Sequence, residues 1–468
     1  MEKRRFFILS GLLLLLPFLG FGQEASNTPL QELIQKALQQ NRELENLRLG
    51  YHKTQIQKKQ AWGTFIPKIS VNGGYSYANL NVYDIPTPEA LLGLGGTIGS
   101  LIPILPPQLG GMLEAMLGQM GPMPETLGAS INDMNIWNAG INARMVLFSG
   151  LKVTYLSKAL DHKMMAEQFM VSRHQGEVMK EVSDYYDKLG MIQASALVLE
   201  DGRKLLDKQR KRAEAAMANG LITKYDFQKI EIAALDLDTR EVELEGNRAL
   251  VLHRLHQLTG EDMATLKLMK VDLKVWVDVN GENGIGARPE LAALEQVVKA
   301  REYQVKSTIS GYLPKAMAFG TQQYIKIEDV ATIDPLNMVG VGVTWELFDG
   351  FHTAHERQRA KIDRQIAQNQ LDDARDLMGL ALEKTKVDYE VNSGKIEVLQ
   401  KKSEKAQLGL QIRSKEYGEG LATVNELLEA LTDLQKTEME LNQAIYAQRR
   451  AGIALLEATG NLHLENIQ

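Results

Sequence analysis

The sequence predicts a mainly α-helical, internally duplicated chain that also carries four β-strands, and three observations support this fold class. Stretches of alternating apolar and polar residues indicate strands. Two stretches of 69 residues without a proline, 151–219 and 351–419, indicate very long helices. Short motifs also recur 200 residues apart: Leu147–Gly150 as Leu347–Gly350, Asn219–Leu221 as Glu419–Leu421, and Leu258–Gly260 as Ala458–Gly460. Self-similarity at a fixed offset is the signature of a repeated architecture.

One insertion separates the two copies of the repeat. Arg42–Leu44 matches Pro289–Leu291, and Pro67-Lys68 matches Pro314-Lys315, both at an offset of 247. The offset falls to 200 further along, so the first copy carries 47 extra residues, which we place at about 84–131. This segment is rich in Gly, Pro, Leu and Met, and residues 90–113 carry no charge. A transmembrane helix is one interpretation. Its glycines and prolines favour a loop with short helices that contacts lipid, the rim of a barrel or a neighbouring subunit.

The first 22 residues have the composition of a secretory signal peptide. A basic start, Lys3 to Arg5, precedes an apolar run from Phe6 to Phe21 and small residues around Gly22. This order is typical of a cleaved export signal, although the apolar run lies near the lower limit for a membrane anchor. We therefore expect the mature chain to leave the cytoplasm.

Composition narrows the function classes further. The chain has a net charge of −6, which argues against a nucleic-acid partner. It contains no cysteine, so no disulfide is required and no lipid can be attached at a cysteine.

Helices are predicted before each pair of strands. Apolar residues at helical spacing run from Leu30 to about Phe65 within the first N-terminal segment, 23–66. The second copy repeats this pattern in segment 288–313, and Pro67 and Pro314 end the two stretches.

Strand pairs are predicted in segments 67–148 and 314–348. Trp137, Ile141 and Met145 alternate with polar residues, and Val341, Val343 and Trp345 repeat this pattern in the second copy. Such alternation fits strands with lipid on one side and water on the other. A small soluble sheet with one buried face is the alternative, and the export signal and the duplication favour the membrane interpretation.

Two long helical hairpins follow, in segments 149–260 and 349–460. A continuous helix of 69 residues would be about 100 Å long. Gly220 and Gly420 end the first arms, and Thr223 and Thr423 are good caps for the return helices. Apolar residues on the return helices recur three, four or seven apart, which predicts a coiled-coil seam. Segment 261–287 connects the two copies, with a possible short strand at 271–277, and 461–468 is a short tail.

The order of strand pair, long helix, glycine turn and return helix, present twice behind a signal peptide, resembles the TolC family of outer-membrane efflux channels. The similarity spans essentially the whole mature chain. Its local motifs are the Phe-x-Gly after each strand pair and the Gly-Leu turns, with Asp226 and Glu426 downstream. The resemblance implies a homotrimer in the outer membrane of a Gram-negative bacterium. Its chains share a 12-stranded transmembrane β-barrel, which continues as a long α-helical coiled-coil tunnel in the periplasm.

The same resemblance implies site residues and partners. The glycine turns would meet a periplasmic adaptor protein, which connects the channel to an inner-membrane pump; this maps onto Asn219, Gly220, Leu221, Glu419, Gly420 and Leu421. In the family, acidic residues one helical turn apart face the narrow tunnel entrance, and here they match Glu426 and Glu429. Asp226 and Tyr417 match further gate positions. The basic partner expected near position 422 is absent, because Ala422 stands there.

An acidic ring would select cations, and mutual repulsion would raise some of its pKa values. An ordinary solvated helix face is the simpler interpretation of Glu426 and Glu429. The pairs His253/His256 and His352/His355 have metal-ligand spacing but no third ligand, and the glycines at 93–99 lack the context of a phosphate loop.

The sequence therefore predicts no metal site, no cofactor site and no catalytic site. A secreted structural coiled-coil protein without a pore is the alternative to a passive export channel.

Overall fold

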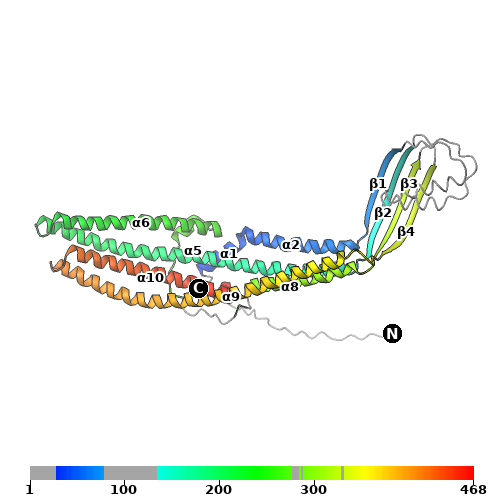
Figure 1. Cartoon of the computed structure of the whole chain (residues 1–468). Coiled ribbons are helices and arrows are strands. Elements are labelled where there is room, and N and C mark those ends of the chain that lie inside the picture. Colours follow the sequence, from blue (N-terminus) through cyan, green and yellow to red (C-terminus); the bar gives the residue numbers. More distant parts are fainter. Residues whose placement is uncertain (1–27, 79–133, 277–283, 286–287, 328–330, 468) are drawn as a thin grey trace, which may run out of the picture. The chain divides into compact units, whose positions relative to one another are not determined.

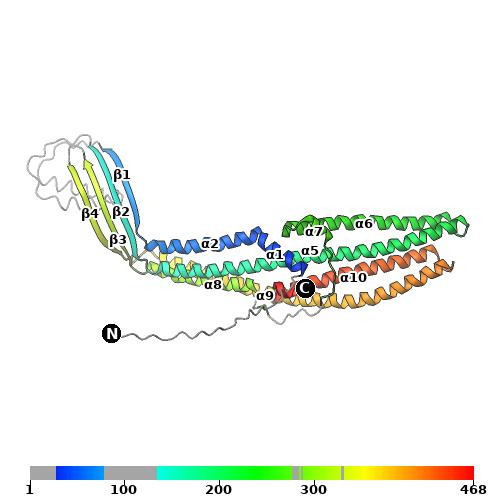
Figure 2. The ribbon, with the colours of Figure 1, turned by 180° about the vertical axis from the view of Figure 1, so that it is seen from behind.

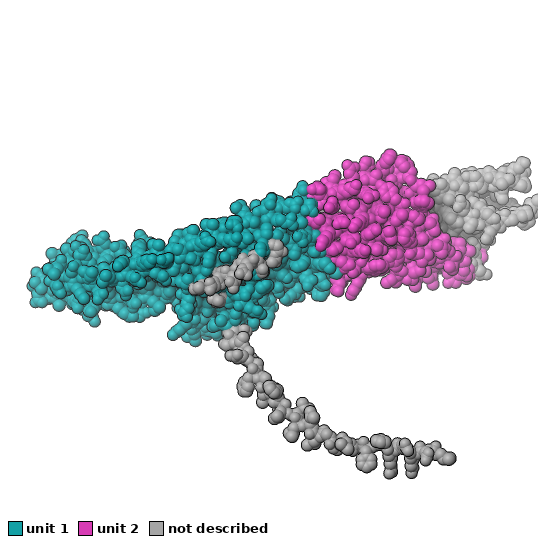
Figure 3. All heavy atoms as spheres, turned by 90° about the horizontal axis from the view of Figure 1, so that it is seen from below, with its two compact units in different colours: residues 1–52, 164–297, 367–468 teal, residues 53–163, 298–366 magenta. Residues whose placement is uncertain are grey.

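The computed structural model describes residues 28–78, 134–276, 284–285, 288–327 and 331–467. The signal peptide and the insertion at 84–131 lie outside these ranges. The chain divides into two compact units, coloured separately in Figure 3: unit 1 comprises residues 1–52, 164–297 and 367–468, and unit 2 comprises residues 53–163 and 298–366.

Unit 2 contains one antiparallel sheet of four strands. These are β1 (Lys68–Ala78), β2 (Met134–Phe148), β3 (Lys315–Ile327) and β4 (Ala331–Thr344), and they lie in the order β1-β2-β3-β4 (Figure 1). Each predicted strand pair forms adjacent strands, and the two pairs join between β2 and β3.

The register of the sheet places the apolar residues of β1, β2 and β4 on one face, to which β3 contributes the polar residues Gln322 and Lys326. Val71 pairs with Ile141, and Tyr75 pairs with Trp137, whose ring centroid lies 4.6 Å from that of Tyr75. Met145 and Val341 both pair with Ala318, so these residues share one face. On the other face, the Asn142 amide donates to Asn72 Oδ1 (2.6 Å), and Thr321 Oγ1 donates to Asn142 Oδ1 (2.7 Å). Cross-strand amide and hydroxyl pairs of this kind suit a hydrated surface.

Trp345 does not belong to a strand, contrary to the sequence prediction. Pairing ends at Lys315 and Thr344. Pro314 precedes Lys315 and has no backbone N–H to donate, so the ladder cannot extend further. The indole Nε1 of Trp345 instead donates to the carbonyl oxygen of Tyr312 (3.2 Å).

The duplication is visible in backbone conformation as well as in sequence. Left-handed residues occur in pairs 200 apart: Gly150/Gly350, Leu151/Phe351, Gly220/Gly420 and Gly260/Gly460, all with φ between 63° and 75°. Leu151 and Phe351 are costly in this conformation because they carry a Cβ. Both copies retain it at the turn between a strand pair and a long helix.

The N-terminal helical stretch predicted from Leu30 to about Phe65 is divided into two helices. α1 spans Pro29–Gln40 with a capping box at Thr28, and α2 spans Arg42–Trp62 before a short 3₁₀ turn, η1 (Gly63–Phe65). Asn41 adopts an extended conformation, and its Oδ1 accepts from the backbone N–H of Leu44 (2.9 Å). A side chain that caps the second helix therefore interrupts the first.

The long helices are α5 (Lys152–Ala218), α6 (Lys224–Thr259), α9 (His352–Gly418) and α10 (Val424–Ala458). Figures 1 and 2 show α6 beside α5 and α10 beside α9, as two hairpins. The predicted seam of α6 is buried at Ile230, Leu237 and Leu255, and that of α10 at Leu427 and Leu431. In the second copy, α8 (Pro289–Ser307) precedes a 3₁₀ turn, η4 (Thr308–Gly311). None of the helices within the described residues is both long and apolar enough to span a bilayer.

Residues 269–276 of the connecting segment, called the strap here, contact α5 and α10 of unit 1, and the described part of the suggested strand, 271–276, is not a strand; residue 277 lies outside the described residues. After α7 (Met263–Leu268) the backbone forms neither helix nor strand, and side chains bind its polar groups. Gln193 of α5 donates to the carbonyl of Met269 (2.8 Å) and accepts from the N–H of Val271 (2.9 Å). Gln448 of α10 likewise accepts from the Trp276 N–H (3.1 Å) and donates to its carbonyl (2.7 Å). The tail ends in a last 3₁₀ turn, η5 (Leu464–Asn466).

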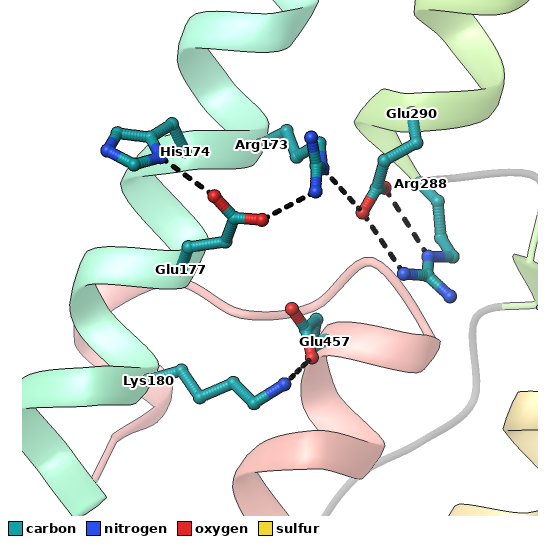
Figure 4. Close-up of polar contacts among 7 residues, drawn as sticks. All are labelled: Arg173, His174, Glu177, Lys180, Arg288, Glu290 and Glu457. Atoms are coloured by element: carbon teal, nitrogen blue, oxygen red, sulfur yellow. Dashed lines mark hydrogen bonds and ion pairs between the residues drawn. The ribbon is translucent and has the colours of Figure 1, made fainter. Parts of the chain in front are cut away.

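Ion pairs in unit 1 connect α5 to α8 and α10 (Figure 4). Arg173 lies between Glu177, at 2.6 Å, and Glu290, at 3.7 Å, and Arg288 also contacts Glu290 (3.1 Å). Lys180 reaches Glu457 on α10 at 2.6 Å. These side chains are partly exposed, so each pair contributes little and the set mainly fixes helix register.

One ion pair between α5 and α10 is buried. Arg449 Nε donates to Asp187 Oδ1 (2.8 Å), and its Nη1 donates to the carbonyl of Lys274 in the strap (3.2 Å). The Asp187 side chain is 3% exposed. Burial raises the pKa of Asp187 to about 6, although Arg449 opposes this shift. The native state therefore favours protonated Asp187, and the stability from that protonation is present below pH 4 and lost as pH rises through about 6.

Arg449→Met should destabilise unit 1 more at pH 8 than at pH 5. At pH 8 the variant leaves a buried, ionised Asp187 without a cation, which costs about 3–5 kcal/mol. At pH 5 a neutral carboxyl needs no cation, so the loss should be smaller. Thermal melting at both pH values measures this difference, with the exposed Arg210→Met as control. An equal loss at both pH values would show that the charge of Asp187 does not matter.

Candidate functional tip

The two helical hairpins of unit 1 end in turns with the same hydrogen-bond pattern. In the first, the N–H of Leu221 donates to Ala216 O (2.9 Å) and that of Gly220 to Met217 O (3.0 Å). In the second, Leu421 donates to Glu416 O (2.8 Å) and Gly420 to Tyr417 O (3.1 Å). This is the Schellman motif, which needs a left-handed residue that glycine supplies at least cost.

The turns present apolar side chains to solvent. Leu221 is 76% exposed and Leu421 is 74% exposed. Beneath them lies an apolar cluster that includes Ile230, Val424 and Leu431, with Tyr417 packed against it. The six predicted docking residues therefore occupy two equivalent turns over a shared core, and an exposed leucine at each tip suits a protein partner.

Threonine caps start both return helices, as the sequence indicated. Thr223 accepts at its side chain from the Asp226 N–H (3.1 Å), and Thr423 accepts from the Glu426 N–H (3.3 Å). The Thr423 N–H in turn donates to Glu426 Oε2 (2.7 Å), which completes a capping box.

Glu426 thus has a local structural role that the sequence prediction did not give it. The backbone N–H and the hydroxyl of Thr423 stabilise its carboxylate and lower its pKa. The Thr223 hydroxyl lowers the pKa of Asp226 in the same way. Within one chain these two acids are therefore favoured in the charged form, opposite to the rise expected from repulsion between acids. Glu429, one turn further along α10, is exposed.

Two of the predicted gate residues lie near each other across the hairpins. Tyr417 on α9 is half-buried, and burial together with the charge of Asp226 on α6 raises its pKa. Gln209 Nε2 of α5 also donates to Ser414 Oγ of α9 (3.1 Å). These contacts hold the first and second hairpins together next to the turns.

Arg413 is a cation of this region that the sequence prediction did not include. Its Nη1 contacts Glu416 Oε2 at 2.8 Å and Glu426 Oε1 at 3.9 Å. The prediction expected a basic residue near position 422, in the turn between α9 and α10, whereas Arg413 lies on α9, one turn before Tyr417. Arg413 and Tyr417 are four residues apart, so they lie on one face of α9, and this spacing could have identified Arg413 from the sequence.

The histidine pairs do not gather ligands. No group of three or more His, Asp or Glu side chains within the described part of the chain is placed to hold a metal ion. His256 Nδ1 contacts the carbonyl oxygen of Glu261 at 2.7 Å.

Comparisons with known proteins agree with this geometry. Residues 284–461 match the model of the family described as Outer membrane efflux protein. The chain is 23% identical over 340 residues to outer membrane efflux protein BepC of Brucella suis biovar 1 (strain 1330), covering 70% of this chain and 73% of BepC.

Solved structures share its fold. The outer-membrane channel OprN gives a TM-score of 0.72 at 15% identity, covering 92% of this chain and 90% of OprN. VceC from Vibrio cholerae gives 0.70 at 16% identity, covering 92% and 96%. The resemblance inferred from the duplicated motifs is thereby confirmed.

Gly420→Ala should loosen the second turn. A Cβ in the left-handed conformation costs about 1–2 kcal/mol, so exchange of the backbone amides of residues 419–423 should become roughly tenfold faster. Hydrogen–deuterium exchange measures this. Gly246→Ala, in the middle of α6 with open space around it, is the matched control and should be neutral or slightly stabilising. The same exchange rate in both variants would show that the left-handed glycine is not needed.

Proposed function

We propose, from this similarity to outer membrane efflux proteins, that the chain is the outer-membrane channel of a tripartite efflux or secretion system. Three copies enclose one pore. Substrates enter from an adaptor and an inner-membrane pump, pass through a helical tunnel in the periplasm and leave through a β-barrel. The tunnel opens and closes at the helical tip, and the chain itself performs no chemistry.

The open edges of the sheet support a trimer. Among the described residues, β1 and β4 each have a neighbour on one side only, so each leaves a row of backbone groups without a partner there. Open edges are not tolerated in lipid, and four strands are too few to close. Twelve strands from three copies close a barrel wide enough to hold water. The apolar face seen in the register would then contact lipid. Its residues include Trp137, Ile141, Met145, Val341 and Val343.

An exposed apolar seam on α9 supports the same assembly. Its members recur three, four, seven or ten residues apart, which fits a heptad pattern, and each is between 47% and 70% exposed. Sustained heptad spacing indicates that the helix packs against another helix. The helix of a neighbouring copy is the occupant that trimerisation supplies. The seam consists of Leu377, Leu380, Val387, Val391, Val398, Leu408 and Ile412.

A charged groove on unit 1 supports a hydrated tunnel wall. It has a volume of about 890 Å³ and is lined by α5, α9 and α10, with charges of both signs that include Asp184, Asp388, Lys384 and Arg450. The strap contacts α10 at Gln448 and Arg449, whereas the groove uses Ala447, Arg450 and Ala454. At 100° per residue these sets occupy different sides of α10. The strap would then lie outside the tunnel and the groove inside.

The tip supports the gate and the docking roles. Glu429 is exposed and has no capping function, so in a trimer it is free to contribute to a ring of acidic side chains. The turns with Leu221 and Leu421 offer equivalent apolar contacts to an adaptor.

Glu429→Gln should weaken cation selectivity without disturbing the fold. Wild-type protein in planar bilayers should pass cations in preference to anions, and the variant should lower the permeability ratio at least about twofold. Reversal potentials in a salt gradient measure this ratio. Glu243→Gln, an exposed acid in the middle of α6, is the control. If the permeability ratio is unchanged in Glu429→Gln, this residue is not part of the gate. If wild-type protein passes no current, the proposal of a channel is wrong.

A further inference from the structure

Exposed aromatic side chains gather where the helices of unit 2 meet the strands. They come from the ends of α2, η4 and β4 and from the start of α9, and each is between 46% and 74% exposed: Trp62, Tyr312, Trp345, Phe348 and Phe351. The indole of Trp62 also donates to Ser157 Oγ (2.9 Å). Tryptophan and tyrosine concentrate at the surfaces of a membrane. These residues, called the aromatic belt here, therefore indicate where the lipid ends.

The helical segments of unit 2 next to this belt are strongly basic. Residues 53–62, 152–163, 298–307 and 352–366 contain thirteen Lys or Arg and four Asp or Glu, whereas the whole chain has 53 and 59. The sign of the charge thus reverses in this region. The thirteen residues, called the basic collar here, are Lys53, Lys58, Lys59, Lys152, Lys158, Lys163, Lys299, Arg301, Lys306, Arg357, Arg359, Lys361 and Arg364.

The fold brings several of these cations close together. Lys306 lies 4.7 Å and Lys158 lies 5.7 Å from the ring centroid of Tyr303, and His162 stacks on the same ring at 5.3 Å. Glu302 pairs with Lys306 (2.7 Å), and Asp161 pairs with Lys58 (2.6 Å). Four acids cannot balance thirteen cations, so the remaining positive charge repels itself unless anions from outside the chain neutralise it.

The distance from the belt decides which anions are within reach. Lys152 follows the last residue of β2 by four positions, and the α5 members of the collar span about 16 Å along the helix. Electrostatic attraction acts over about 8 Å at physiological salt. The nearest collar residues therefore lie within reach of lipid headgroups at the belt. Their origin on four separate segments also matches a surface that surrounds the protein better than it matches a single bound ligand.

We propose that the basic collar binds anionic phospholipid headgroups in the leaflet that faces the helices. This proposal rests on the membrane placement given under the proposed function. The collar fixes how deeply the protein sits in the bilayer, because the aromatic belt marks the edge of the apolar layer and the cations hold the headgroups beyond it.

The test uses the full chain, purified in detergent from membranes and mixed with micelles that contain phosphatidylglycerol or phosphatidylcholine. Native mass spectrometry then counts the lipids that stay bound. Wild-type protein should retain phosphatidylglycerol at least about tenfold better than phosphatidylcholine, and the preference should fall as salt rises. The variant Lys59→Gln, Lys152→Gln, Lys306→Gln, Arg357→Gln removes exposed collar residues nearest the belt on each of the four segments and should lose most of this preference.

A second fourfold variant provides the matched control. Lys208→Gln, Arg210→Gln, Lys211→Gln and Lys405→Gln remove the same charge from exposed positions of unit 1 and should leave the preference unchanged. An equal loss in both variants would show that net charge, not the collar, attracts the lipid. Binding of the collar variant to purified peptidoglycan should match wild type; a loss there with an intact lipid preference would assign the collar to the cell wall and overturn the proposal.

Planar-bilayer current separates this proposal from the proposed function. Both variants should conduct as wild type does, which also verifies that they fold. Wild-type protein that conducts without a preference for phosphatidylglycerol would overturn the collar and leave the channel intact. If the protein is soluble without detergent and carries no current, the proposed channel function itself is wrong.

Discussion

In the part of the chain that the structure describes, the outer edges of β1 and β4 carry unpaired backbone groups, and these are the constraint on which the rest of the structure depends. Each edge strand leaves donors and acceptors that must find partners before the apolar face of the sheet can enter lipid. The helices carry a related deficit, because α9 presents its heptad seam to solvent along the part that belongs to unit 1. The proposed assembly of three copies would satisfy both deficits. The conduit, its wall and its acidic entrance would then be properties of that assembly rather than of a single chain.

Charge is distributed along the chain in a way that fits this account. The chain is acidic overall, the tip places Asp226, Glu426 and Glu429 at the ends of the helices, and the segments beside the strands are basic. Capping threonines hold two of the tip acids in the charged form within one chain. A trimer would bring further acids toward them, so the fold has a local device that offsets the repulsion that assembly would create.

The duplication made the long elements predictable. The Gly-Leu pair that recurs 200 residues apart located both glycine turns, and α5 and α9 end within two residues of Gly220 and Gly420. Local chemistry was sufficient there, because a left-handed glycine and a capping threonine act through their immediate neighbours. The apolar alternation in β2 and β4 likewise predicted one face of the sheet, which the register confirms.

The sequence failed where a distant side chain decides the structure. Alternation at 271–277 suggested a strand, but Gln193 and Gln448 satisfy that backbone, and they lie far away in the sequence. Asn41 fits a helical pattern in the sequence, but in the structure its side chain caps the next helix and ends the first. Arg413 was overlooked because its contact with Glu426 crosses from one helix to another. The periodicity of apolar residues depends on residues that are close in sequence. These three features depend instead on side-chain contacts that the periodicity does not describe.

The number of chains in the particle tests the central claim most directly. Light scattering of the detergent-solubilised protein, corrected for bound detergent, gives the protein mass without reference to function. The account predicts three chains per particle, with no stable smaller species under conditions that preserve the fold. A folded single chain, monodisperse in buffer without detergent, would contradict it, because neither the sheet edges nor the α9 seam would then need a partner.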